Sequence, residues 1–223
     1  MINHDVEKII KSGKQLINKM HEDKNCSNRS WEHCYSEFLK YKGKKLTDNS
    51  KDQLCLHLAC YMASFGMYRA STKLQEKDYK VQVAAVEELM KNDYFDLWAV
   101  ECKELISSDN KMDKLIILRD ELKRIYCEIG VSHTDTLITK VLLGTLGCTP
   151  ALDINFSSGF RGKKGAHMTF NVKNMREISK FYVNNNDELE ELRKDASTKK
   201  LLYPQMRVLD LCFYGQGEGI NLV

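Results

Sequence analysis

The sequence contains only two prolines, Pro150 and Pro204, and few segments in which polar and apolar residues alternate. Proline interrupts helices, so its scarcity leaves almost the whole chain free to form them. Apolar residues recur at helical spacing in most segments, which predicts an all-α bundle of about nine to ten helices. We expect a single helical domain over residues 1–223, or two helical lobes over residues 1–108 and 109–223.

Paired cysteine spacings are also missing. The eight cysteines are scattered, without a CxxC or CxxH pair or a four-cysteine cluster. This spacing excludes the usual zinc and iron–sulfur patterns, and we expect neither a metal nor a cofactor. Residues 1–14 are charged and lack the apolar stretch of a secretory signal, which favours free thiols in a reducing cytoplasm. The longest apolar run, residues 54–68, is shorter than the roughly 20 residues that span a bilayer, so no membrane partner is expected.

A strong net charge is absent as well. The formal charge is +3 at pH 7, which neither requires nor excludes a nucleic acid, so a basic surface would have to be local. Arg161, Lys163 and Lys164 lie in a glycine-rich segment that follows Asp153. We expect a flexible loop over residues 155–170 whose cations clamp a phosphate. The alternative is a solvated surface loop without a ligand.

Local signals place several of the helices and loops. Apolar spacing, caps and breakers predict the following helices: 4–22, 51–72, a helix that begins near Ser108, 172–184 and a short last helix over 203–214 with Pro204 near its first turn. Residues 42–52 are polar and glycine-containing, and residues 215–223 contain three glycines. We predict a loop over the first of these segments and a loose tail over the second.

Residues 129–156 combine several local signals in a defined order. Gly130 allows a tight turn between two helices, and N–H groups at the start of a helix bind phosphate well. Thr134 or Ser132 is a candidate cap for the following helix. Residues 147–150 contain a glycine and a proline that end this helix. Asp153 follows the turn, either as a functional carboxylate or as a simple helix cap.

This order resembles the core of the helix-hairpin-helix DNA glycosylases. In that family a hairpin binds the DNA backbone, and an aspartate after the next helix faces a nucleotide flipped out of the duplex. The resemblance implies that Asp153 is the catalytic carboxylate, which stabilises the cationic sugar as the base departs. It also implies that the hairpin contacts the DNA backbone through Gly130, Val131, Ser132, His133 and Thr134.

The sequence departs from the family pattern at several positions. Ser132 replaces the second hairpin glycine. Lyase-competent members carry a lysine in the helix after the hairpin, whereas residues 133–135 read His-Thr-Asp, so a Schiff-base mechanism is not expected. The usual Asp-Thr-His after the turn is Asp-Ile-Asn at residues 153–155. The resemblance therefore implies a monofunctional glycosylase that hydrolyses the N-glycosidic bond.

A second resemblance covers most of residues 50–215. Residues 62–71, 142–153 and 203–213 together are similar to a set of uncharacterised bacterial proteins. This similarity implies a bacterial or phage setting and supplies no chemistry. Together, the two resemblances imply a cytoplasmic role in DNA repair or phage defence.

Two arginines outside this segment are expected to bind an acidic side chain or a ligand. Tyr68 and Arg69 end the most apolar helix of the chain, where an arginine needs an acidic partner or a ligand. With Lys73 they form a candidate site for a small anion or a nucleotide. Asp210 lies in an apolar segment, and we expect it to form an ion pair with Arg207. The alternative to a DNA-acting enzyme is therefore a non-catalytic helical module that binds a protein, a small anion or a nucleotide.

Overall fold

The computed structural model describes residues 5–222 and is all-α in that part of the chain, which confirms the predicted fold class. Eleven α-helices are present there, a little more than the number expected. They are Val6–Glu22 (α1), Arg29–Tyr41 (α2), Asp48–Ser64 (α3), Val83–Leu89 (α4), Cys102–Ser107 (α5), Asp109–Glu128 (α6), Asp135–Thr145 (α7), Ile154–Arg161 (α8), Val172–Asn184 (α9), Asn186–Ala196 (α10) and Gln205–Leu222 (α11). Short 3₁₀ helices span Ala70–Thr72, Leu74–Glu76, Tyr79–Gln82 and Asn92–Leu97.

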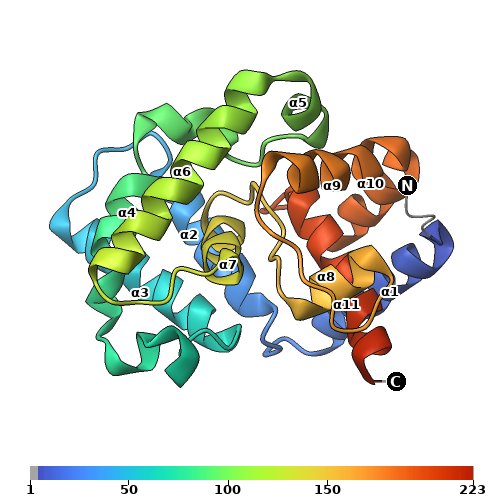
Figure 1. The fold of residues 1–223 in the computed structure, drawn as a ribbon, viewed down its shortest axis with the longest axis horizontal. Helices are drawn as coiled ribbons and strands as arrows, with labels where there is room; N and C mark the ends of the chain where they lie inside the picture. The colour runs from blue at the N-terminus through green and yellow to red at the C-terminus, as the bar shows by residue number, and fades with distance from the viewer. Residues whose placement is uncertain (1–4, 223) are drawn as a thin grey trace.

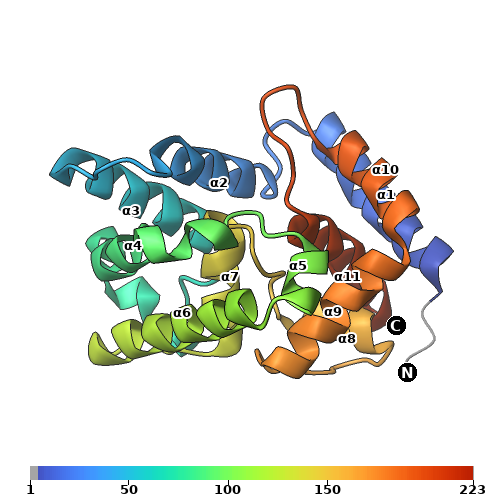
Figure 2. The ribbon, with the colours of Figure 1, turned by 90° about the horizontal axis from the view of Figure 1, so that it is seen from above.

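The helices form two groups on either side of α7 (Figures 1 and 2). One group contains α2, α3, α4 and α6, and the other contains α8, α9, α10 and α11. The first helix, α1, packs mainly against α10 and α11. Residues 6–22 therefore lie beside the C-terminal helices. The boundary between residues 108 and 109 stays a prediction.

Local capping signals determine where several helices begin and end. The Ser108 hydroxyl accepts the Lys111 N–H at the start of α6, and the Thr134 hydroxyl accepts the Leu137 N–H at the start of α7. Gly147 has a φ of +65° just past α7, a conformation that glycine adopts without strain. These ends agree with the sequence-based expectations, as do the bounds of α9.

The helix expected over 51–72 is shifted toward the N-terminus. Thr47 and Ser50 form a reciprocal capping box, so α3 begins within the expected loop. It ends at Ser64 because Gly66, with a φ of +69°, turns the chain.

Two glycine-rich segments predicted as loops are helical, which corrects the sequence-based prediction. Residues 154–161 form α8, and α11 continues to residue 222. The two helices approach closely because glycine has no side chain. A Cβ on Gly159 would lie 2.0 Å from the Phe213 carbonyl oxygen, and one on Gly217 would lie 1.7 Å from the Asn155 carbonyl oxygen. Close packing, and not flexibility, therefore accounts for these glycines.

The core holds α7 between the two groups of helices. The Trp31 indole N–H of α2 donates to the Leu143 carbonyl at 2.8 Å, and the Tyr61 hydroxyl of α3 donates to the Lys140 carbonyl at 3.0 Å. All these groups are buried, so the bonds form in a low-dielectric interior. None of the helices in residues 5–222 has the length and apolar composition that crossing a bilayer requires.

Candidate functional site

A polar pocket of about 180 Å³ lies where α3, α7, α8 and α11 meet. Asp153 is in its wall, so the aspartate singled out from the sequence does face a concave surface. The lining residues come from segments far apart in the sequence: Ser27, Asn28, Ser64, Phe65, Lys140, Asp153, Asn155, Arg207, Asp210, Leu211 and Tyr214.

Asp153 is the N-cap of α8, and its two carboxylate oxygens have different environments. Oδ1 accepts the Phe156 N–H at 3.0 Å, which is the ordinary capping bond. Oδ2 lies 3.4 Å from the Lys140 ammonium nitrogen. The two interpretations of this residue are therefore compatible, because one oxygen caps the helix while the other contacts a cation at the pocket.

Lys140 is the lysine that the sequence-based reasoning missed. It is only 7% exposed, although it lies in an otherwise apolar stretch of α7. Its ammonium group donates to the Phe65 carbonyl at 2.9 Å and faces Asp153. The available signal was that Lys140 is the one charged residue between Asp135 and Asp153. A charged side chain within an apolar helix has to find a partner.

Arg207 and Asp210 form a buried ion pair beneath the pocket, as their spacing in the sequence indicated. Arg207 Nη1 lies 2.6 Å from Asp210 Oδ2, and the guanidinium lies over the Trp31 ring at 4.9 Å. Asp210 Oδ1 accepts the Ala151 N–H at 2.9 Å, which holds the turn before Asp153. Burial raises the pKa of the Asp210 carboxyl; the Arg207 charge opposes this rise, and the Asp153 charge adds to it.

The hairpin at residues 130–132 uses its backbone N–H groups internally. Gly130 donates to the Cys127 carbonyl at 3.0 Å, and Val131 donates to the Tyr126 carbonyl at 2.9 Å. Ser132 donates to the Thr72 carbonyl at 3.1 Å. These amides therefore end α6 and anchor the 66–80 segment. Contacts to a phosphate would have to come from side chains at the exposed positions His133 and Thr134.

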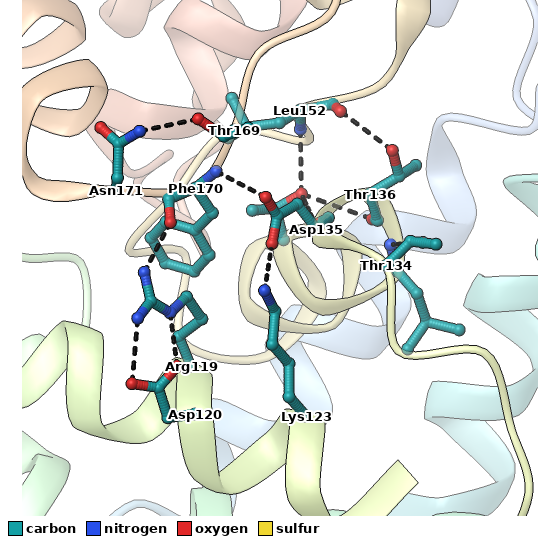
Figure 3. A network of polar contacts seen from close by, with 12 residues as sticks. Arg119, Asp120, Lys123, Thr134, Asp135, Thr136, Leu152, Thr169, Phe170 and Asn171 are labelled. Atoms are coloured by element: carbon teal, nitrogen blue, oxygen red, sulfur yellow. Dashed lines mark hydrogen bonds and ion pairs between the residues drawn. The ribbon is translucent and has the colours of Figure 1, made fainter. Parts of the chain in front are cut away.

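The start of α7 is joined directly to the segment that carries Asp153 (Figure 3). The Thr136 hydroxyl donates to the Leu152 carbonyl at 3.0 Å, and the Leu152 N–H donates to the Thr139 hydroxyl at 2.9 Å. The hairpin and the candidate aspartate are thus connected through the first turns of one helix.

A carboxylate, that of Asp135, occupies the N-terminal turn of α7. Asp135 accepts the Phe170 N–H at 2.8 Å and lies 2.6 Å from the Lys123 ammonium nitrogen. Arg119 donates to the Phe170 carbonyl at 2.6 Å, so this backbone unit is held on both sides (Figure 3). Asp135 therefore has a structural environment and does not line the pocket.

The cations of the glycine-rich segment do not lie beside Asp153. Arg161 is the last residue of α8, whose eight residues extend about 12 Å at roughly 1.5 Å per residue. Its guanidinium binds Glu177 at 2.9 Å and the Asn174 side chain at 2.8 Å, both on α9. Lys163 and Lys164 are exposed in the turn that follows. The basic segment and Asp153 are thus at opposite ends of α8.

The candidate site around Arg69 is separate from the pocket as well. Tyr68, Arg69 and Lys73 lie in the irregular segment after α3, and none of them lines the pocket. Arg69 and Lys73 are exposed, so the expectation of a buried arginine in need of a partner was wrong. The cause is the early end of α3 at Gly66, which takes residue 69 out of the apolar helix.

Metal binding and known relatives add no further assignment. Among residues 5–222, no group of three or more His, Cys, Asp and Glu side chains is arranged to hold a metal ion. The eight cysteines are unpaired. Comparisons of the chain with known protein families, with curated proteins and with solved structures found no match. The resemblance to the helix-hairpin-helix glycosylases therefore stays a prediction.

Proposed function

We propose that this chain acts on DNA and excises a base by hydrolysing its N-glycosidic bond, with Asp153 as the catalytic carboxylate. The observation that supports the proposal is that the two carboxylate oxygens of Asp153 make different contacts. One oxygen caps α8 and fixes the side chain, while the other contacts Lys140 at a polar pocket of about 180 Å³. A carboxylate held in this way is preorganised for a developing positive charge. DNA repair or phage defence would be the setting.

The chemistry requires a positioned negative charge and an extruded nucleotide. The bond between the sugar C1′ and the base nitrogen breaks, and its electron pair leaves with the base. Water then adds to C1′ and loses a proton, the departing base takes up a proton, and a free base and an abasic sugar remain. A carboxylate beside C1′ stabilises the oxocarbenium-like transition state. The nucleotide has to leave the base stack to reach such a pocket.

Exposed side chains on two segments outside the pocket offer contacts for a DNA backbone. His133 and Thr134 are exposed on the hairpin that is joined to the Asp153 segment through α7. Lys163 and Lys164 are exposed in the turn after α8 and supply cations. We propose that these side chains, and not the hairpin amides, bind phosphates. Binding through such cations weakens as salt is raised, whereas an interaction module without phosphate contacts would depend little on salt.

One observation favours a second candidate, a glycosylase that also cleaves the abasic site. The Lys140 amine lies 3.4 Å from Asp153 and is almost fully buried. In its neutral form it could condense with the aldehyde of an abasic sugar to give an imine and water. Borohydride would reduce that imine to a stable amine, so covalent trapping on DNA separates this candidate from the monofunctional enzyme.

The test is base release from duplexes that carry damaged or modified bases. Asp153→Asn is the informative variant, because asparagine caps helices about as well as aspartate and removes only the charge. We expect its rate to fall by about 10²-fold or more, the usual range for the loss of one such group. Asp5→Asn is the matched control, since Asp5 caps α1 in the same way and lies outside the pocket. Activity that survives Asp153→Asn would disprove the assignment.

A further inference from the structure

The amide group of Asn28 has a defined orientation at the pocket. Its Oδ1 accepts a hydrogen bond from Arg207 Nη2 at 2.9 Å. A guanidinium has no acceptor, so the oxygen of the amide must face Arg207. The NH₂ group then faces away from the arginine, and within residues 5–222 it makes no hydrogen bond. Asn28 therefore offers the pocket a donor and not an acceptor.

A second chain of hydrogen bonds orients Asn155 in the same sense. Asn155 Oδ1 accepts from the Asn221 amide at 2.8 Å, so the oxygen faces Asn221 and the NH₂ group is left to donate. Asn155 also lines the pocket. Two side chains from distant segments of the chain thus both present donors to it.

The charged groups of the pocket add one further donor and few acceptors. The Lys140 ammonium has three protons, and one of them is left after its contacts with Phe65 and Asp153. Both oxygens of Asp210 are already used by Ala151 and Arg207. Among these charged groups, the outward oxygen of Asp153 is then the main acceptor. A ligand that satisfies this pattern carries several acceptor atoms.

We infer that the pocket recognises a heterocyclic ring that carries carbonyl oxygens. In DNA this means a base with a carbonyl where its counterpart has an exocyclic amine, such as uracil against cytosine or hypoxanthine against adenine. The DNA form of the inference rests on the proposed base excision. An exocyclic amine would place a donor against the donors of Asn28 and Asn155. A site built to hydrogen-bond one group rejects an analogue that leaves its polar groups unpaired.

Asn28→Asp tests this recognition directly. The carboxylate still accepts from Arg207, so the structural contact is kept, while the NH₂ donor becomes an acceptor. We expect the wild-type protein to prefer uracil over cytosine by about tenfold or more, the equivalent of one hydrogen bond of about 1.4 kcal/mol. Asn28→Asp should shift this ratio toward cytosine by a similar factor. Asn25→Asp, in the same turn but outside the pocket, should leave the ratio unchanged.

Two measurements keep this inference distinct from the proposed function. Base release from matched duplexes containing uracil or cytosine reports catalysis, whereas equilibrium dialysis with the free bases reports the pocket alone. Preference for free uracil without any base release supports the inference and overturns the proposed function. Base release without a preference between the two bases supports the proposed function and overturns the inference.

A further variant covers the case in which Asn28→Asp fails to fold. Asn155→Asp keeps the oxygen that accepts from Asn221 and turns the second NH₂ donor into an acceptor, so it should shift the uracil-to-cytosine ratio toward cytosine. Equal binding of uracil and cytosine by the wild type would overturn the inference. A uracil-to-cytosine ratio that neither variant changes would overturn it as well.

Discussion

Removal of Arg207 should destabilise the protein strongly, and the cost should depend on pH. Arg207→Met keeps an unbranched side chain over the Trp31 ring and deletes the charge that faces Asp210 at 2.6 Å. Arg207 is 1% exposed, so water cannot take its place. Breaking a buried ion pair by removing one partner costs about 3–5 kcal/mol, since the other charge is left uncompensated. We expect a loss of this size near neutral pH.

The sign of the pH dependence follows from Asp210. Burial raises the pKa of this carboxyl in the folded protein, and removal of the Arg207 charge raises the pKa further. A raised pKa means that the folded state binds the proton more tightly than the unfolded state, so stability falls as pH rises through this range. The loss of stability caused by Arg207→Met should therefore shrink as the pH falls toward the pKa of an aspartate in the unfolded chain, about 3.9.

The assay is urea unfolding of the wild type and the variant at pH 7.5 and at pH 4.5, with the slope of each transition compared. An unchanged slope indicates that the free energy of unfolding itself has changed. Arg124→Met is the control, because Arg124 pairs with Glu121 and Glu128 on an exposed face of α6 and its removal should have little effect at either pH. An equal destabilisation by Arg207→Met at both pH values would refute the role given to Asp210.

Two further predictions concern the packing of α11 and the chemistry of Lys140. Gly217→Ala should destabilise the protein by about 1–3 kcal/mol in thermal or urea unfolding, because the new Cβ would lie 1.7 Å from the Asn155 carbonyl oxygen. Gly219→Ala, with open space around the new Cβ, should instead be neutral or stabilise α11 by up to about 1 kcal/mol; the same cost for both would contradict the packing account. If the protein also cleaves abasic sites, borohydride should trap the wild type on abasic DNA and should not trap Lys140→Met. Trapping that persists in this variant would assign the amine to another residue.

The sequence-based predictions succeeded where the signal is local. The cap at Thr134, the stop at Gly147 and the bounds of α9 each depend on residues within one or two turns. They failed at the glycine-rich segments of α8 and α11, because glycine has a low helix propensity and tertiary packing overrides it. The contact between Gly159 and the backbone at Phe213 joins two distant segments, so no local pattern could show it.

The candidate site was predictable only in part, for the same reason. Asp153 lines the pocket, and its place after the Pro-turn was the signal that found it. Lys140 was missed because the glycosylase pattern was compared with residues 133–135. Lys140 lies further along α7 and reaches the pocket from there. Asn28 and Arg207 are 179 positions apart in the sequence, and only the folded structure shows that they are in contact. The residues proposed here to select a ligand are thus those that the sequence could not bring together.

The most direct test of the central claim compares single-turnover base release by the wild type, Asp153→Asn and Asp5→Asn on one duplex from which the wild type removes a base. Our account predicts that Asp153→Asn folds normally and loses about 10²-fold or more of the rate, while Asp5→Asn retains it. Equal rates for the two variants would show that the pocket at Asp153 is not where the chemistry occurs. A wild-type protein that releases no base from any duplex would contradict base excision itself.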